Sequence, residues 1–204
     1  MDTAWVLSDA AGTVYTKAQQ ETAIAAWQSW WADQGLGEGS RVAVLLTPSS
    51  QHVLALHALA GLGAIALPIH LRWSPVEIGR WLTATNATHL LWEPATADLA
   101  TGCPDSLPRI LLEAIPPQAI AAAPRAPTSQ RTLYWLPTSG SSGPPKPIPL
   151  TLDNLRQSAS AAATCLPPNP AIGPCWRCPV PCGRFGAGLA LRLAVHPPGG
   201  AAPI

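Results

Sequence analysis

The sequence predicts an α/β fold in which helices cover a parallel sheet. Strand-like runs alternate with helix-like segments through short connections, and each such crossover places a helix on a face of the sheet. The first run, residues 41–46, is almost entirely apolar, as expected for a strand that is buried on both faces. Polar caps at the helix starts support the same order of elements.

Three helix starts can be read from the caps. Thr16 begins a capping box that ends at Gln19, and Ser49 or Ser50 precedes the second helix. Ser74 begins another capping box, with proline at the first helical position. Helices are expected from 16 to the stop at 35, from 50 to 62, from 75 to 85 and from 151 to 164. Strands are expected at 41–46, 64–69, 89–92, 109–112 and 131–136, and residues 94–130 otherwise form a connector.

The apolar residues of the first helix recur at helical spacing. Trp27 and Trp31 fall on that periodic face, so we interpret them as core residues and not as a stacking platform. His52, His57, His70 and His89 sit on predicted helices or beside strands, and we interpret each as structural.

Composition and charge exclude several classes of protein. The chain has 204 residues and a net charge of +1, which gives no electrostatic field for nucleic acid. The longest apolar run, residues 53–69, is interrupted by Gly61, Gly63 and Pro68 and is too short to span a bilayer, which takes about 20 residues. The N-terminus has neither a basic region nor an apolar segment typical of a secretory signal, so we expect a soluble cytoplasmic protein without a membrane span.

A stretch rich in hydroxyl groups and glycine, residues 137–147, follows the strand predicted at 131–136. Its hydroxyl groups, its two glycines and Lys146 could surround a phosphate chain that approaches the bare backbone. The residues concerned are Thr138, Ser139, Gly140, Ser141, Ser142, Gly143 and Lys146. A flexible linker is the alternative interpretation. The P-loop of nucleoside triphosphatases is excluded, because its Gly-Lys-Ser/Thr ending is missing.

The order of these residues resembles the phosphate loop of the adenylate-forming enzymes, which include the AMP-binding acyl-CoA synthetases. That loop reads Thr-Ser-Gly-Ser/Thr-Thr-Gly-x-Pro-Lys-Gly and is followed by Leu-Thr-x-x-Asn-Leu, which 150–155 match. Ser142 stands where the family prefers threonine, and Pro147 stands where it prefers glycine. The resemblance covers residues 14–166 and implies a partial N-terminal domain of this family, residues 1–168, with the phosphate loop at 137–147.

The resemblance also implies an activity. In this family a carboxylate attacks the α-phosphate of ATP, and a thiol such as CoA then displaces AMP from the acyl-adenylate. The seven loop residues would hold the β- and γ-phosphates, with ATP and Mg²⁺ as cofactors and a carboxylic acid and CoA as partners. The family's Thr-Glu motif for magnesium, its ribose aspartate and its C-terminal lysine have no match here, and no acidic residue follows Asp153. We therefore expect an N-terminal fragment that completes neither half-reaction.

The substrate is less defined than the family. The brief segment before Arg41 and the Arg72-x-Ser74-Pro75 pattern resemble o-succinylbenzoate-CoA ligase of menaquinone or phylloquinone synthesis. A generic acyl-CoA synthetase or an amino-acid adenylation domain has the same loop.

The tail, residues 169–204, is rich in proline and cysteine. Cys175-x-x-Cys178, with Cys182 or His196, has spacing that could bind zinc. A zinc site in the tail would support the alternative function, which is a non-enzymatic α/β interaction module with a metal-binding tail. A second hypothesis is that the tail is out of frame from a point between Asn169 and Gly173. If Arg177 is encoded by a CGN codon, a one-base offset there encodes an apolar strand like the one that the family has at this point.

Overall fold

The computed structural model describes residues 7–8, 14–112, 123–138 and 145–165. The chain divides into two compact units, residues 1–153 and 154–204. The first unit contains a six-stranded sheet, whose strand order is β6-β5-β3-β4-β7-β8. These strands are β3 (Arg41–Leu45), β4 (Ile65–Pro68), β5 (His89–Trp92), β6 (Arg109–Leu111), β7 (Thr132–Thr138) and β8 (Lys146–Thr151).

All neighbouring pairs of the sheet are parallel except the β7–β8 hairpin. Ala43 lies opposite Leu67 on one side and Leu90 on the other, so these three side chains form one row across the centre of the sheet. The predicted α/β class with a mostly parallel sheet is therefore confirmed. A separate two-stranded antiparallel sheet, β1 (Leu7–Ser8) with β2 (Val14–Tyr15), was not predicted.

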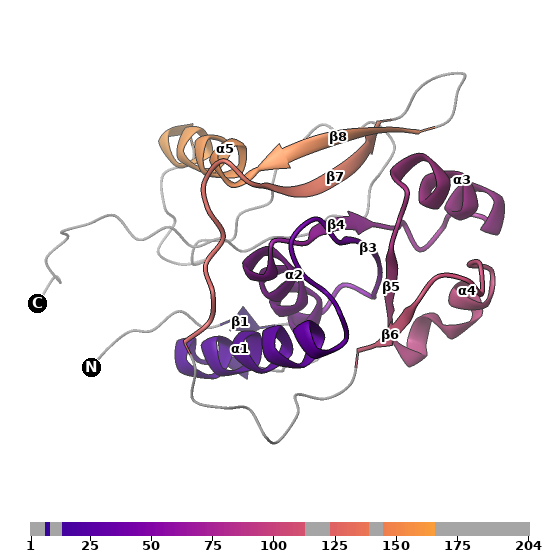
Figure 1. Cartoon of the computed structure of the whole chain (residues 1–204). Helices are drawn as coiled ribbons and strands as arrows, with labels where there is room; N and C mark the ends of the chain where they lie inside the picture. The colour runs from indigo at the N-terminus through magenta and orange to yellow at the C-terminus, as the bar shows by residue number, and fades with distance from the viewer. Residues whose placement is uncertain (1–6, 9–13, 113–122, 139–144, 166–204) are drawn as a thin grey trace, which may run out of the picture. The chain divides into compact units, whose positions relative to one another are not determined.

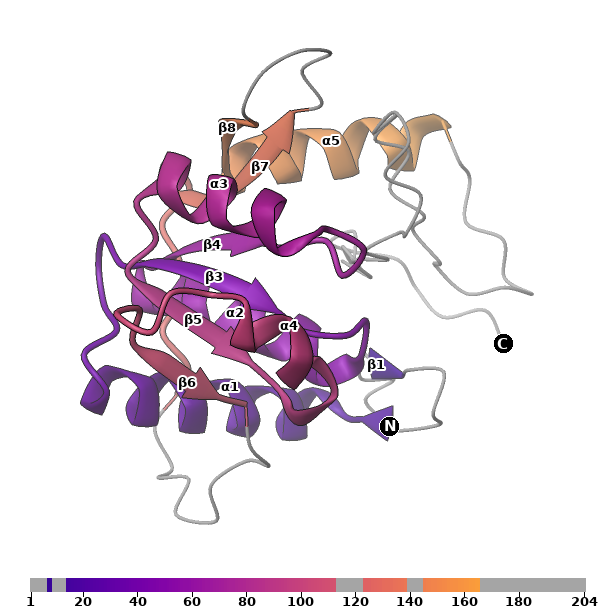
Figure 2. The same ribbon diagram turned by 90° about the vertical axis from the view of Figure 1, so that its right-hand side faces the viewer.

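Helices cover both faces of the sheet (Figures 1 and 2). The helices α1 (Lys17–Asp33) and α2 (Ser50–Leu62) pack together on one face. The opposite face carries α3 (Pro75–Thr85) and the short α4 (Ala97–Thr101), which follows a 3-10 turn at Pro94–Thr96. Because α3 buries Ile78, Trp81 and Leu82 against the row of Ala43, Leu67 and Leu90, this face forms a continuous core.

The caps predicted from the sequence are present. The Thr16 hydroxyl accepts a hydrogen bond from the N–H of Gln19, and the Gln19 side chain accepts one from the N–H of Thr16. Ser74 and Glu77 form the same reciprocal box at the start of α3. Ser49, not Ser50, caps α2 through the N–H of His52. Each of these bonds satisfies an amide that the first helical turn leaves without a partner.

Both tryptophans of the predicted core face are fully buried. Trp27 and Trp31 stack with ring centroids 5.6 Å apart and planes inclined by 7°. Since helical positions i and i+4 lie on the same face, this stack fixes the face of α1 that is turned inward. The interpretation of these residues as core is confirmed.

One prediction about the connections was wrong, and one strand was not predicted. Residues 94–101 are helical and not an irregular connector, because Glu93 and Thr96 form a local cap that periodicity does not reveal. The two ends of the predicted phosphate-binding stretch, residues 137–147, lie in strands, because Pro137 and Thr138 end β7 while Lys146 and Pro147 begin β8. Proline is rare inside strands, so sequence patterns give little sign of a strand that carries Pro147 and Pro149.

The helix predicted to follow residue 151 is α5 (Leu152–Cys165), which lies mainly in the second unit. The predicted zinc ligands Cys175, Cys178, Cys182 and His196 lie outside the described residues, as does the tail as a whole.

Candidate phosphate-binding site

Five parallel strands, β6, β5, β3, β4 and β7, end at the same edge of the sheet. Ala66 of β4 lies opposite both Val42 of β3 and Tyr134 of β7, so the strands are level with one another. Counting along them from this row brings Pro68, the last residue of β4, level with Leu136, two residues before the end of β7. Open α/β sheets bind ligands at the carboxyl ends of their strands. The predicted phosphate-binding stretch therefore begins at the edge where a ligand is expected.

Thr138 and Lys146 are the two predicted site residues that the structure describes. They lie directly opposite each other as the last pair of the β7–β8 hairpin, and the Thr138 hydroxyl donates to the Lys146 carbonyl oxygen at 3.3 Å. Both residues are exposed. Because residues opposite each other in a ladder project from the same face, the hydroxyl and the ammonium group are presented together.

The other five predicted site residues are Ser139, Gly140, Ser141, Ser142 and Gly143, and they lie outside the described residues. Their role stays a prediction. The structure does add one feature that the motif did not reveal, since it shows the two ends of the stretch paired as strands. Any ligand held by the intervening residues would be flanked by Thr138 and Lys146.

Pro147 stands in β8, opposite Pro137 of β7. Two pairs further along the ladder, Trp135 lies opposite Pro149. Because the two kinds of pair alternate, this pair is of the same kind as Pro137 with Pro147. Proline has no N–H, so neither pair can be of the type in which two residues exchange both backbone hydrogen bonds. The alternation of an antiparallel ladder then makes Thr138 and Lys146 a hydrogen-bonded pair.

A second polar group lies where β3 and β5 end. The N–H of Thr47 donates to the Glu93 carboxylate, and the His52 Nδ1 lies 3.2 Å from the Thr47 carbonyl oxygen. A carbonyl can only accept, so the Nδ1 of His52 carries the proton. Thr96 connects the turn after β5 to the end of β3, because its hydroxyl donates to the Leu45 carbonyl oxygen at 2.8 Å.

The His52 side chain is buried, and burial lowers the pKa of its imidazole, although the Thr47 carbonyl and the Glu93 carboxylate oppose that shift. The ring is held neutral and joined to the backbone, as a structural residue would be. His70 and His89 are also engaged locally: His70 accepts from the N–H of Arg72 at 3.1 Å, and His89 lies 2.9 Å from the Thr88 hydroxyl. Sequence reasoning did not single out Glu93 or Thr47, since neither belongs to a motif.

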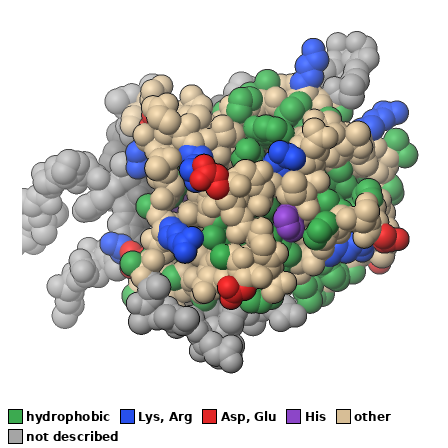
Figure 3. Space-filling model, viewed as in Figure 1, with side chains coloured by type: hydrophobic (Ala, Val, Ile, Leu, Met, Phe, Trp, Pro, Cys, Tyr) green, Lys and Arg blue, Asp and Glu red, His purple; other side chains and the backbone are tan. Residues whose placement is uncertain are grey.

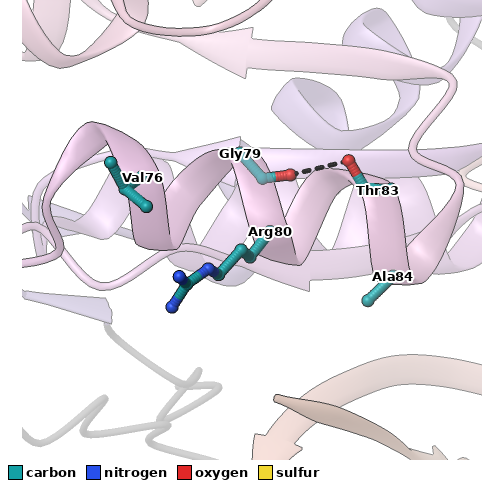
Figure 4. Close-up of a pocket in the computed structure, with 5 residues that line it drawn as sticks. All are labelled: Val76, Gly79, Arg80, Thr83 and Ala84. Carbon is teal, nitrogen blue, oxygen red and sulfur yellow. Dashed lines mark hydrogen bonds between the residues drawn. The ribbon is translucent and has the colours of Figure 1, made fainter. Parts of the chain in front are cut away.

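A shallow hollow lies elsewhere, along the outer face of α3 (Figure 4). Its lining within the described residues is Val76, Gly79, Arg80, Thr83 and Ala84, and the Thr83 hydroxyl donates to the Gly79 carbonyl at 2.9 Å. Only one of these side chains is charged. The hollow therefore lacks the converging polar groups of a catalytic centre, and we place the candidate site at the hairpin.

Three further observations on the described residues concern charge, metal binding and membrane-spanning helices. On the face shown in Figure 3, the lysine and arginine side chains lie apart from one another, and some of them lie beside acidic side chains. Within the described ranges, no group of three histidine, cysteine, aspartate or glutamate side chains could hold a metal ion. No helix there is long and apolar enough to cross a membrane.

Comparison with known sequences relates the chain to large synthases. A curated relative, the polyketide synthase-nonribosomal peptide synthetase hybrid himA of Aspergillus japonicus, is 31% identical over 130 residues, which are 63% of this chain and 3% of that protein. The hybrid synthetase thnA of Trichoderma harzianum is 29% identical over 154 residues, which are 74% of this chain and 4% of that protein. The chain thus spans only a small part of the curated relatives that it matches.

Comparison with solved structures supports the fold. The N-terminal domain of FACL13 from Mycobacterium tuberculosis matches with a TM-score of 0.67 at 22% identity, over 76% of this chain and 42% of that one. The o-succinylbenzoate coenzyme A synthetase MenE of Bacillus subtilis, in complex with AMP, matches with a TM-score of 0.66 at 22% identity, over 77% and 41%. At this identity the likeness shows the fold alone.

The family model of the AMP-binding enzymes matches residues 4–184, which is most of the chain. This match includes the β7–β8 hairpin, the stretch between its strands and α5. With the mostly parallel sheet covered by helices, it establishes the family. The chain belongs to the AMP-binding enzymes.

Proposed function

We propose that this chain holds the phosphate groups of ATP at the β7–β8 hairpin, as the N-terminal part of a ligase that activates a carboxylic acid as its adenylate. The observation that carries the proposal is the pairing of Thr138 with Lys146 at the carboxyl end of β7. The Lys146 ammonium group can donate to phosphate oxygens, and so can the Thr138 hydroxyl on the same face once its O–H rotates away from the Lys146 carbonyl. Ser139, Gly140, Ser141, Ser142 and Gly143 would add hydroxyl and backbone donors between them.

In this proposal the chain's residues stabilise charge. When a carboxylate attacks the α-phosphate, pyrophosphate leaves and negative charge builds on its oxygens. Lys146 would face that charge, and donors already in position need little reorganisation as the charge develops. Mg²⁺ would enter with the nucleotide, because Mg²⁺ commonly keeps substrate phosphates among its ligands and the described residues offer no metal site of their own.

The class of acid is a separate proposal. The curated relatives are hybrid polyketide and peptide synthetases, which favours an amino acid as the carboxylate and a carrier-bound thiol as its acceptor. The structural match to MenE keeps o-succinylbenzoate and CoA as the second candidate. Binding of two stable adenylate analogues, one with an aminoacyl group and one with an o-succinylbenzoyl group, would separate these candidates by their relative affinities.

The chain by itself is proposed to bind nucleotide without turnover. Its sequence has no match to the family's magnesium glutamate, ribose aspartate and C-terminal lysine, which the resemblance assigns to the chemical step. Zinc analysis of the purified protein tests the alternative, an interaction module with a metal-binding tail, because that alternative requires stoichiometric zinc. Sequencing of the source DNA tests the proposed frame offset near residue 169.

Calorimetric titration of the chain with ATP and Mg²⁺ tests the phosphate proposal. The chain has only two lysines, Lys17 and Lys146, which gives a matched pair of substitutions. Lys146→Ala is expected to weaken binding about tenfold or more, since a hydrogen bond to a charged group contributes about 1.5–3 kcal/mol. Lys17→Ala removes only an exposed contact with Glu21 at 3.8 Å and should leave the affinity unchanged.

Gly140→Ala extends the test to the stretch between the strands, where an added Cβ would obstruct approach of a phosphate to the backbone. Equal affinity of wild type and Lys146→Ala would contradict the proposal, as would equal losses in the two lysine variants. A folded chain that shows no saturable binding would also contradict it.

A further inference from the structure

The prolines of the β7–β8 hairpin occupy one side of its ladder. Pro137 lies opposite Pro147, and Pro149 lies opposite Trp135. These two pairs are of the kind that exchanges no backbone hydrogen bonds across the hairpin. The missing N–H groups of Pro147 and Pro149 therefore point away from β7. The hairpin loses no cross-strand bond to either proline.

The same geometry decides what Pro147 does at the base of the predicted loop. Proline fixes its φ angle near −65°, so Pro137 and Pro147 each fix one arm immediately before Thr138 and immediately after Lys146. The family motif has glycine at the position of Pro147, and glycine would leave that arm free to rotate. In this chain the arms are restricted on both sides at the same level of the ladder.

The side chains on this face connect the hairpin to the core. Trp135 packs against the cluster that α3 and α4 form on the sheet. Because the pleat alternates, Pro137, Pro147 and Pro149 lie on the same face as Trp135, whereas Thr138 and Lys146 lie on the opposite face. Pro147 is half-buried and Pro149 is exposed. The proline pair nearest to Lys146 is thus on the side that the core supports.

We propose that Pro137 and Pro147 are positioning residues that hold Thr138 and Lys146 in register before the nucleotide arrives. This inference rests on the proposed function, because the benefit is to the binding of ATP phosphates. With the two arms fixed, binding does not have to order them, and affinity is higher for that reason. Pro147 is therefore a replacement for glycine that preserves the site.

Pro147→Ala and Pro149→Ala form the matched test. Both substitutions introduce an N–H that points away from β7, where the described residues place no further strand, and both release one φ angle, but only Pro147 adjoins Lys146. Pro147→Ala is expected to weaken ATP binding about two- to fivefold, the range that corresponds to releasing one backbone constraint. Pro149→Ala should change the affinity less than twofold.

A second readout separates positioning from general stability. Amide hydrogen exchange measured by NMR should become faster at Thr138 and Lys146 in Pro147→Ala but not in Pro149→Ala. The two variants should lower the thermal unfolding midpoint by the same small amount, because each releases one φ angle in the unfolded chain. A positioning role is contradicted if the two variants lose affinity equally, if Pro147→Ala binds ATP as well as wild type, or if its exchange is unaltered.

The two readouts also distinguish this inference from the proposed function. If wild type does not bind ATP, the proposed function fails, and the role in ATP affinity fails with it. Hydrogen exchange then still shows whether Pro147 orders Thr138 and Lys146. If wild type binds ATP and Lys146→Ala does not, but Pro147→Ala changes nothing, only the present inference fails.

Discussion

The centre of the sheet and the β7–β8 hairpin belong to one sheet but have opposite surroundings. In β3 the residues from Val42 to Leu45 are at most 1% exposed, because parallel neighbours flank the strand and helices cover both its faces. In the hairpin only Leu133 is buried, and Ile148 is 43% exposed. The buried strands have no room for polar side chains, so the phosphate-binding candidates occur where burial ends.

This difference predicts that stability and ligand binding can be altered separately. Substitutions around β3, β4 and β5 should change the free energy of unfolding, whereas those at Thr138 and Lys146 should change affinity for ATP.

Trp81→Ala tests how much the buried core contributes to the free energy of unfolding. Trp81 is fully buried against the sheet and contacts Trp73 edge-on, with ring centroids 6.2 Å apart. Its removal leaves a large cavity, and we expect a loss of about 3–5 kcal/mol in the free energy of unfolding. Urea denaturation monitored by circular dichroism measures this loss. Val76→Ala in the same helix is the control, because Val76 is 63% exposed. Comparable losses in the two variants would mean that the face of α3 that carries Trp81 is not part of the core.

Gly61→Ala tests the contact between α1 and the segment before β7, in which Gln28 binds the backbone of Arg125. A Cβ at Gly61 would overlap the side-chain nitrogen of Gln28 and the carbonyl oxygen of Arg125. Gln28 holds Arg125 through two hydrogen bonds, accepting from its N–H at 2.7 Å and donating to its carbonyl at 3.0 Å. We expect a loss of about 1–3 kcal/mol, as for other overpacked sites, measured by the same denaturation.

Gly79→Ala is the matched control for Gly61→Ala. Gly79 also lies inside a helix, but no atom lies within 4 Å of the position its Cβ would take. Alanine should therefore stabilise α3 by about 0.5–1 kcal/mol. A stabilising effect at both glycines would show that Gln28 does not clamp Arg125 against α2.

His52 is expected to add a pH dependence to the stability of the core. Burial lowers the pKa of this imidazole below its ordinary value of 6.5, so the unfolded chain takes up a proton at a higher pH than the folded chain does. Stability is therefore complete above pH 6.5 and falls as the pH decreases towards the lowered pKa, by at most about 1.4 kcal/mol per pH unit for one group.

His52→Asn should retain a donor near the Thr47 carbonyl without a titrating ring. Denaturation at pH 7.5 and 5.5 is expected to show a smaller acid loss in this variant than in wild type. Burial also lowers the pKa of His89, so part of the loss will remain. A pH dependence identical to that of wild type would exclude His52 as a contributor.

The sequence was sufficient for those elements whose signals are local. The capping boxes at Thr16 and Ser74 located two helices, and the apolar run at 41–46 located the central strand. The strand β8 was missed because Pro147 and Pro149 contradict strand propensity, and its existence depends on pairing with β7. The contacts of Glu93 with Thr47 and of Gln28 with Arg125 join residues far apart in the chain, which no local pattern reveals.

The strand order has a consequence for how the chain folds during synthesis. β4 pairs with β7 through Ala66 and Tyr134, and residues 69–131 separate the two strands. Ribosomes add roughly 5–20 residues per second, so the edge of β4 that pairs with β7 stays unpaired for several seconds during synthesis. An unpaired strand edge favours pairing with other chains. Chaperones that shield nascent strands should therefore raise the yield of this protein, and slower translation of residues 69–131 should lower it.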